Sequence, residues 1–307
     1  MLQEGRYRKR MILGQDGNSL VTLLAILAIV FCIFKFIYIT YYLSGLSEIA
    51  FYKNIFDWFR LPAEVDKIMT RPWTIFTYMF MHDGVFHLLG NLLWLWAFGF
   101  ILQDLAGNSK LVPLFIYGGI AGAFLFVLSN NIFPVLSSQI EGRTLEGASA
   151  GVMAVAIATT TLAPDFRIFP MLNGGIPLWA LTIIFVIIDF ASITGQNGGG
   201  HIAHLGGAAI GFVFVLQLRK GNDWSLWMNR FFSWSANLFN PDKKDWKKSA
   251  KKELYYNSKG AQPYKKVANI TQKRVDEILD KINQQGYRFL TDEEKEILKR
   301  ASEDEHL

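Results

Sequence analysis

Cysteine is almost absent from this sequence: among 307 residues there is one, Cys32, and it lies inside an apolar segment. A lone cysteine excludes a disulfide framework within the chain and the paired-cysteine spacing of a zinc knuckle. The zinc-protease signature H-E-x-x-H is absent as well. We therefore expect no cofactor-binding residues and no metal-binding residues.

Basic residues are sparse through the middle of the chain. They cluster within residues 6–10 and again after Arg219, and the net charge is only +5. A nucleic-acid-binding protein would show a basic face across a folded domain, so no nucleic-acid partner is expected. Basic ends on either side of an apolar middle instead fit a membrane protein whose N- and C-termini are both cytoplasmic, under the positive-inside rule.

Long apolar runs are what the sequence has in abundance, with 51% hydrophobic and 15% aromatic residues. The first run has neither the short apolar core nor the small-residue cleavage site of a signal peptide, so we expect it to remain as a helix. Six runs approach the length of a membrane helix: residues 20–43, 85–102, 111–128, 149–164, 177–193 and 201–218. The predicted fold class is an all-α polytopic membrane protein, a bundle of six transmembrane helices with a small helical cytoplasmic C-terminal tail.

Composition divides the chain into four parts: a basic cytoplasmic N-terminus (1–18), a six-helix membrane domain (19–218), an interfacial amphipathic and basic linker (219–271) and a small helical hairpin (272–307). The linker begins with a stripe of aromatic residues and continues with six lysines, a pattern typical of contact with the lipid bilayer and its anionic headgroups. In the hairpin, Thr291 and Glu294 predict a capping box. Residues 194–200 are glycine-rich and predict a flexible turn.

Polar side chains within these runs mark a candidate site. Ser149 stands between small residues at the start of the fourth run, where the free N–H groups of a helix terminus favour negative charge. A serine nucleophile needs a base. The candidates are the four histidines in or beside apolar runs: His82, His87, His201 and His204. Six alternating crossings bring the Ser149 end and the His204 end to the same outer side of the membrane.

Three motifs in order along the chain resemble the rhomboid family of intramembrane serine proteases: His82-x4-His87-x3-Asn91, Gly147-Ala148-Ser149 and Ala203-His204-x2-Gly207-x3-Gly211. The resemblance covers roughly residues 15–220. It implies that Ser149 is the nucleophile and His204 the general base and acid. It also implies an oxyanion hole made of His87, Asn91 and the Ser149 N–H. His82, Gly147, Gly207 and Gly211 would support these groups.

The same resemblance implies the activity: endopeptidase cleavage of transmembrane protein substrates near the outer membrane surface by a Ser–His dyad. It implies lateral substrate entry near the fifth helix and a small residue at the cleaved position. The expected location is the bacterial inner membrane, as a multi-pass protein. Polar residues that share a face of a membrane helix point inward by default, which independently favours the grouping of His87 with Asn91.

The sequence departs from the family pattern at three positions. Ala150 follows the serine where the family often has glycine, and Met153 stands where an aromatic residue is common. The Trp-Arg pair of the first loop reads Trp73-Thr74, with Arg71 nearby. None of these changes removes a catalytic group; they bear on loop geometry and substrate preference.

Other interpretations of the same residues were weighed. Gly147-x-Ser149-x-Gly151 matches the nucleophile elbow of α/β-hydrolases, and Ser149, Asp189 and His204 even follow that triad order. Residues 143–146, which precede the serine, are however too short and charged for the buried strand that an elbow requires. The aspartate is a minor candidate for a third catalytic member, because it would have to reach the far nitrogen of the histidine. Clustered histidines could instead bind metal in a transport protein. A non-catalytic rhomboid-like protein that binds membrane helices is the remaining alternative.

Overall fold

The structure is a computed structural model that describes residues 17–168, 174–195, 197–238 and 272–304. It divides into two compact units, Met1–Leu238 and Phe239–Leu307, and each is treated by itself. Most of the predicted basic N-terminus and residues 239–271 of the predicted linker, with their lysines, lie outside the described residues.

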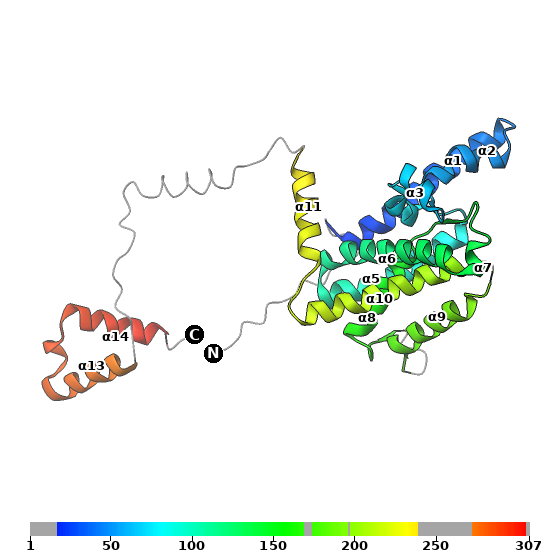
Figure 1. Ribbon diagram of the computed structural model, residues 1–307. Helices are drawn as coiled ribbons and strands as arrows, with labels where there is room; N and C mark the ends of the chain where they lie inside the picture. Colours follow the sequence, from blue (N-terminus) through cyan, green and yellow to red (C-terminus); the bar gives the residue numbers. More distant parts are fainter. Residues whose placement is uncertain (1–16, 169–173, 196, 239–271, 305–307) are drawn as a thin grey trace. The chain divides into compact units, whose positions relative to one another are not determined.

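The first unit is almost entirely helical (Figure 1). Six apolar helices follow the predicted runs to within a few residues: α1 (Ser19–Leu43), α5 (Val85–Ala106), α6 (Leu111–Ile132), α8 (Ser149–Leu162), α9 (Leu178–Ser192) and α10 (Gly198–Arg219). Shorter helices connect or follow them: α2 (Glu48–Asn54), η1 (Phe56–Trp58), α3 (Val65–Thr70), α4 (Thr74–Thr77), η2 (Tyr78–Phe80), η3 (Asn108–Lys110), α7 (Pro134–Ser137) and α11 (Ser225–Leu238). Two short antiparallel pairs join β1 (Leu61–Pro62) to β2 (Thr144–Leu145) and β3 (Arg167–Ile168) to β4 (Ile176–Pro177).

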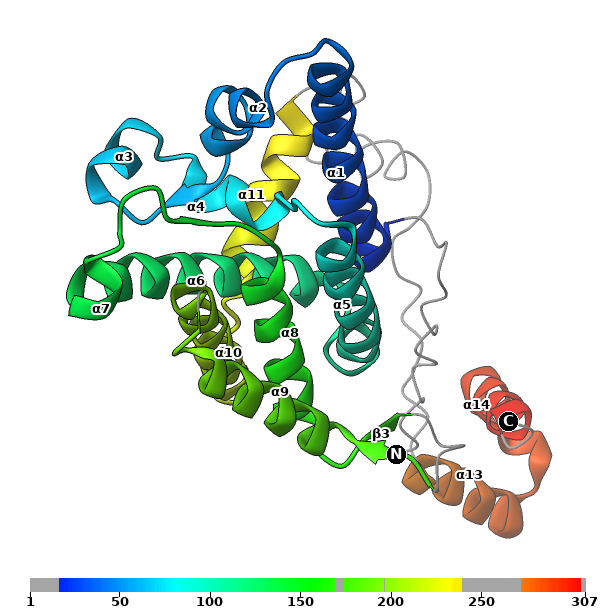
Figure 2. The ribbon, with the colours of Figure 1, turned by 90° about the vertical axis from the view of Figure 1, so that its right-hand side faces the viewer.

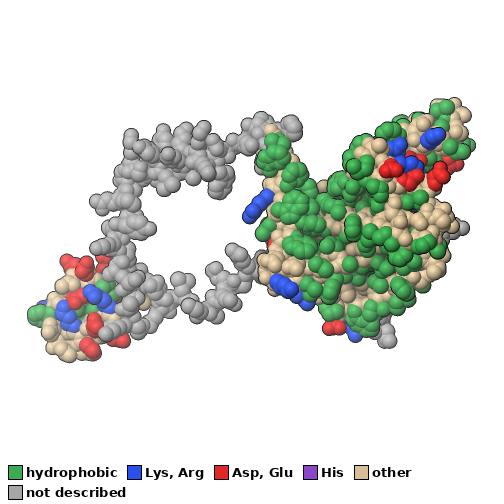
Figure 3. Space-filling view, in the orientation of Figure 1, with side chains coloured by type: hydrophobic (Ala, Val, Ile, Leu, Met, Phe, Trp, Pro, Cys, Tyr) green, Lys and Arg blue, Asp and Glu red, His purple; other side chains and the backbone are tan. Residues whose placement is uncertain are grey.

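Among the described residues, four helices are long and apolar enough to cross a membrane: α1, α5, α10, and α6 together with η3. α8 and α9 are apolar but shorter, with 14 and 15 residues. Hydrophobic side chains cover most of the face of this unit seen in Figure 3, and the charged side chains visible on that face lie at its margins. The protein is therefore an integral membrane protein, mostly helical, with an outer surface suited to lipid.

α8 forms the centre of the first unit. It packs against α5, α6 and α10 and makes fewer contacts with α9 (Figure 2). Nine of its 14 residues are buried, and most of these are alanine, glycine or valine. Small residues let helix backbones approach closely, which is the main way that helices gain packing energy within a membrane.

Glycines on the neighbouring helices make that approach possible. A Cβ atom added at Gly207 of α10 would lie 2.0 Å from the carbonyl oxygen of Ala150, and one added at Gly211 would lie 2.4 Å from that of Ala154. On the α6 side, a Cβ atom at Gly118 would lie 2.4 Å from the Cβ of Ala154. Any side chain at these glycines would push the helices apart.

The segment between α1 and α5 is anchored by polar contacts as well as by aromatic packing. Lys35, the only charge within α1, lies 3.4 Å from the carboxylate of Asp83, so its side chain pairs with the protein. The Tyr52 hydroxyl donates to the same carboxylate at 2.7 Å. Arg60 pairs with Asp57 and lies 3.4 Å from Glu146, which directly precedes the Gly147-Ala148-Ser149 motif. These contacts connect this segment to the loop that leads into α8.

The prediction of a flexible turn over residues 194–200 is wrong at its second half, because α10 already begins at Gly198. Gly198, Gly199 and Gly200 are all buried in the first turn of this helix. A Cβ atom at Gly198 would lie 2.2 Å from the carbonyl oxygen of Ile193, and one at Gly199 would lie 2.6 Å from Nδ2 of Asn130. The glycines are required here by tight packing.

The second unit contains α13 (Gln272–Gln285), η4 (Tyr287–Phe289) and α14 (Asp292–Asp304). Ile278, Leu290 and Ile297 form its buried core. At the start of α14 the Thr291 hydroxyl accepts from the Glu294 N–H, and the Glu294 carboxylate accepts from the Thr291 N–H at 2.8 Å. These two hydrogen bonds are those of the predicted capping box.

We expect Gly207→Ala to destabilise the first unit by about 1–3 kcal/mol, because the added methyl group cannot fit against α8 without a backbone shift. Gly90→Ala on α5 is the matched control, since a Cβ atom there meets nothing within 4 Å. That change should be neutral or stabilising by up to about 1 kcal/mol. Thermal unfolding of the purified protein in detergent measures both. Equal melting temperatures for the two variants would contradict close packing at Gly207.

We expect the stability of the second unit to depend on pH through the carboxylate of Glu294. The hydrogen bond from the Thr291 N–H, followed by that from Lys281, lowers the pKa of Glu294 from 4.5 to about 2. The stabilising effect of Glu294 is therefore present above pH 4.5 and is lost as the pH falls toward 2. In hydrogen exchange on the full chain, Glu294→Gln should speed the exchange of α14 amides near pH 6. The adjacent Glu293→Gln is the control, and an equal effect of the two variants would contradict the assignment.

Candidate active site

The first turn of α8 faces the first half of α10, and two side chains meet between them. The Oγ atom of Ser149 lies 2.6 Å from Nε2 of His204. Ser149 is the first residue of α8, and Val152 makes the first intrahelical hydrogen bond of that helix, to the carbonyl of Ala148. The N–H groups of Ser149, Ala150 and Gly151 therefore precede the intrahelical ladder and point toward the serine end of the helix.

The position of this pair depends on the close helix packing. His204 and Gly207 are three residues apart, so they lie on neighbouring positions of one face of α10. Gly207 fits against the Ala150 backbone directly after the serine, and Ala203 of the same helix contacts the α6 glycine Gly122. A larger residue at Gly207 would increase the distance between Ser149 and His204. Gly207 and Gly211 both lie against the backbone of α8, and their role in supporting the site stays a prediction.

His82 organises the loop before the serine. Its Nε2 atom faces two donors, the Ala148 N–H at 3.3 Å and the Asn91 side-chain amide at 3.1 Å. The amide orientation of Asn91 is defined, because its Nδ2 also donates to the carbonyl of His87 at 3.1 Å. Nε2 of His82 is therefore an acceptor, and its ring proton is on Nδ1. His82 is buried and holds the α8 loop against α5.

His87 and Asn91 lie on one face of α5, as their spacing predicts, and both are next to the serine loop. A Cβ atom at Gly147 would lie 2.8 Å from two atoms of the His87 ring and 3.8 Å from the Ser149 Oγ. Gly147 has φ +111°, and its N–H donates to the carbonyl of Tyr78 at 3.0 Å. The Asn91 amide donates both of its N–H groups, one to His82 and one to the His87 carbonyl. To donate to an oxyanion, it would have to give up one of these hydrogen bonds.

Glu146, in the loop before Ser149, forms an ion pair with Arg60. Burial raises the pKa of this carboxyl group, and Arg60 opposes that effect by lowering it. The contact connects the loop of the nucleophile to the segment between α1 and α5 through a partly buried ion pair. Removing one partner of such a pair destabilises the protein, because the other charge is then left buried without a partner.

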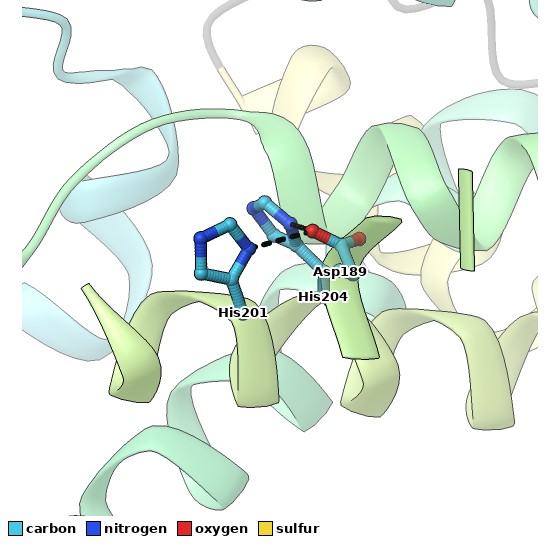
Figure 4. A group of neighbouring side chains, drawn as sticks. All are labelled: Asp189, His201 and His204. Carbon is cyan, nitrogen blue, oxygen red and sulfur yellow. Dashed lines mark hydrogen bonds and ion pairs between the residues drawn. The ribbon is translucent and has the colours of Figure 1, made fainter. Parts of the chain in front are cut away.

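Asp189 lies beside His204, at the ring nitrogen that a third catalytic member would have to reach. Its Oδ1 atom lies 2.9 Å from Nδ1 of His204 and 2.8 Å from Nδ1 of His201 (Figure 4). The two histidines come from the same turn of α10, and the aspartate comes from the facing end of α9. The sequence indicates that Asp189 points inward, because it is the single charged residue of its apolar run, but it does not identify the partner.

The same three residues bear on the metal-binding alternative. Among the described residues, Asp189, His201 and His204 form the one group whose ligand atoms lie within 4.8 Å of one another. His82 and His87 are not part of it. Nε2 of His204 is directed at the serine, and the hydrogen bonds to Asp189 account for the other ring nitrogen, so the geometry is explained without an ion.

Fold and site together define a class: a polytopic helical membrane protein with a serine–histidine pair held between two of its helices. Residues 69–221 match the family model of the Rhomboid domain, and the chain belongs to the rhomboid family. Residues 262–304 match a family of unknown function, DUF6576.

The chain is also similar in sequence to individual rhomboid proteins. The chain is 26% identical over 157 residues to RHOMBOID-like protein 12, mitochondrial, of Arabidopsis thaliana, covering 48% of this chain and 47% of the relative. It is 26% identical over 171 residues to the human presenilin-associated rhomboid-like protein, mitochondrial, covering 53% and 41%. It is 30% identical over 150 residues to the rhomboid protease GlpG of Salmonella newport, covering 48% and 50%. The chain thus spans about half the length of the curated relatives it matches.

We expect Gly147→Ala to slow the reaction of Ser149 with a fluorophosphonate by at least about tenfold, because displacements near 1 Å at a reacting group can cost about 10² in rate. The added methyl group would collide with the His87 ring, and a φ of +111° is strained for an L-residue.

Gly142→Ala is the matched control in the same loop. Gly142 also has positive φ, +73°, but a Cβ atom there meets nothing within 4 Å. Its labelling rate should stay within about twofold of wild type, because the backbone strain of about 1–2 kcal/mol then falls on an exposed residue that contacts none of the site residues. Equal losses in both variants would show that backbone strain, and not the contact with His87, is responsible.

Proposed function

We propose that this protein is an intramembrane serine endopeptidase that cleaves transmembrane segments of other membrane proteins. The observation that carries the proposal is the 2.6 Å contact between the Ser149 Oγ and the His204 Nε2, made between two helices of a rhomboid family protein. A serine hydroxyl is a weak nucleophile until a base takes its proton, and this imidazole is placed to do so.

The chemistry follows from the positions of the two groups. As the Ser149 oxygen attacks the peptide carbonyl carbon, its proton passes to Nε2 of His204, giving a tetrahedral intermediate and an imidazolium. The imidazolium then donates that proton to the leaving amine nitrogen, and the C–N bond breaks to leave an acyl-serine. Water, deprotonated by the same imidazole, releases the acid product and restores the serine.

The negative oxygen of the intermediate needs fixed donors. The Ser149 N–H lies at the start of α8, ahead of its intrahelical hydrogen bonds, where the helix dipole also favours negative charge. His87 and Asn91 are the side-chain donors next to it, and His82 fixes the orientation of the asparagine. One such donor is worth about 3–4 kcal/mol in a site shielded from water.

Helix lengths support a site below the membrane surface. The 14 residues of α8 span about 21 Å, whereas the hydrocarbon layer is about 30 Å thick. The neighbouring α6 has 22 residues and spans about 33 Å. With its C-terminal end at the inner surface, a helix of this length would leave its first residue, Ser149, within the membrane thickness, and water would reach it through the protein.

We infer a six-span arrangement in which α8 and α9 join the four longer helices, with both termini cytoplasmic and the serine toward the outer side. For a bacterial source the inner membrane is the expected location. A helical substrate has its peptide carbonyls hydrogen-bonded, so it must unwind before attack, and segments with helix-weakening residues should be preferred. Entry beside α9 fits the loose packing of this helix, in which only Leu178, Thr182 and Asp189 are buried.

The decisive experiment is labelling of the detergent-solubilised protein by a fluorophosphonate, followed by cleavage of a reporter with one transmembrane segment. Wild type should label and cleave, and Ser149→Ala should do neither. His204→Ala should lose at least about 10³ in rate, as expected for removal of the base of a catalytic pair.

The competing outcomes are distinct. Labelling that survives both substitutions would eliminate the proposed pair. Cleavage that is abolished by a chelator and restored by added metal would favour the histidine–metal alternative. Binding of the reporter by a wild-type protein that neither labels nor cleaves would favour the non-catalytic alternative.

A further inference from the structure

The acid at the end of α9 is unusual in its surroundings. Asp189 is the single charged residue of α9, and its side chain is 3% exposed. Placing a charge in such a helix is costly unless it has partners. No lysine or arginine of the described residues pairs with it. Its recorded hydrogen bonds go to His201 and His204, both through the same oxygen, Oδ1, while Oδ2 is buried without a partner.

We propose that Asp189 is a positioning residue for His204, so that the site works as a Ser149–His204–Asp189 triad with His201 as a second donor to the aspartate. This inference rests on the proposed function and deepens it, because the motifs themselves indicate a serine–histidine pair alone. The chain of contacts is continuous: 2.6 Å from Oγ to Nε2, and 2.9 Å from Nδ1 to Oδ1.

The contact determines which nitrogen of His204 carries the proton. A neutral imidazole has one N–H, and a carboxylate can only accept. Asp189 therefore holds the proton on Nδ1 and leaves the Nε2 lone pair facing the serine hydroxyl, which is the tautomer a general base requires. When Nε2 takes the serine proton, the resulting imidazolium lies against a negative charge. No proton moves to the aspartate in this step.

His201 has a different part from His204. It donates to the same Oδ1 but lies three residues earlier on α10, and its ring is 5.8 Å from that of His204, centroid to centroid. A second donor helps to keep the buried carboxylate charged and fixes its orientation toward His204. Figure 4 shows both imidazoles directed at one carboxylate oxygen of Asp189, so that two hydrogen bonds hold this side chain in place.

A purely structural role is the alternative to be separated by experiment. Asp189 is one of only three buried residues of α9, so it could serve simply to attach this helix to α10. Thr182 offers a matched comparison. It is buried on the same helix, and its hydroxyl lies 2.6 Å from that of Thr160 on α8, away from His204. Thr182→Val loosens α9 at its other end and leaves the histidine untouched.

The test measures kcat and KM for the transmembrane reporter, and the rate of fluorophosphonate labelling, for wild type, Asp189→Asn and Thr182→Val. Asp189→Asn should lower kcat and the labelling rate by at least about 10², with KM within about threefold of wild type. Thr182→Val should keep kcat and labelling within about threefold. A fluorophosphonate is small and needs no lateral entry, so its rate reports on the nucleophile and not on movement of α9.

Each result is decisive. Asp189→Asn that labels at the wild-type rate, or that alters only KM, overturns the triad, as does an equal loss of kcat in Thr182→Val. If Asp189→Asn does not fold, Asp189→Glu takes its place, and a kcat equal to that of Asp189→Ala overturns the triad. Failure of wild type itself to label or cleave would overturn the proposed protease function, a result distinct from all of these.

Discussion

The approach of α10 to α8 without intervening side chains is the constraint on which the rest of this structure depends. Where Gly207 and Gly211 meet the backbone of α8, there is no room even for a methyl group. In a lipid environment the hydrophobic effect does not drive helices together, so contact of this kind is the main source of packing energy. The same contact sets the distance between Ser149 and His204. Stability and site geometry therefore share one cause, and a change that separates the helices affects both.

Around this contact the site is built in two layers. The inner layer holds the groups that can touch a substrate: the serine, its histidine, and the N–H groups at the start of α8. The outer layer holds residues that act on the inner ones. His82 accepts from Asn91 and from the loop before the serine, and Gly147 lets that loop pass beside His87. These contacts fix the loop before the serine, while the Asn91 amide would have to leave one of its two partners to donate to a developing charge.

Asp189 raises the question of what orients an imidazole inside a membrane. Packing alone can hold a ring, but packing does not choose between its two tautomers, whereas a carboxylate at Nδ1 does. The cost is a charge buried on an apolar helix of which only three residues are buried. Sharing of that charge between two imidazole N–H groups offsets part of the cost. It also means that the helix beside which substrates would enter is attached to α10 near the reacting groups.

Much of this was present in the sequence. Apolar runs, judged by length, placed the six helices of the first unit to within a few residues, because burial in lipid or protein imposes the same requirement on every turn of a helix. The order and spacing of His87, Asn91, Ser149 and His204 indicated the site and the family, and Thr291 with Glu294 indicated a helix start from local hydrogen bonding alone.

Tertiary structure decided what depends on contacts between helices. Gly198–Gly200 look like a turn in sequence but are helical, because Ile193 and Asn130 leave space for nothing larger than glycine. Asp189 looks like a residue at a helix end, and only the packing of α9 on α10 shows that its carboxylate meets His204, since the distance between side chains on different helices is not encoded in the periodicity of either one.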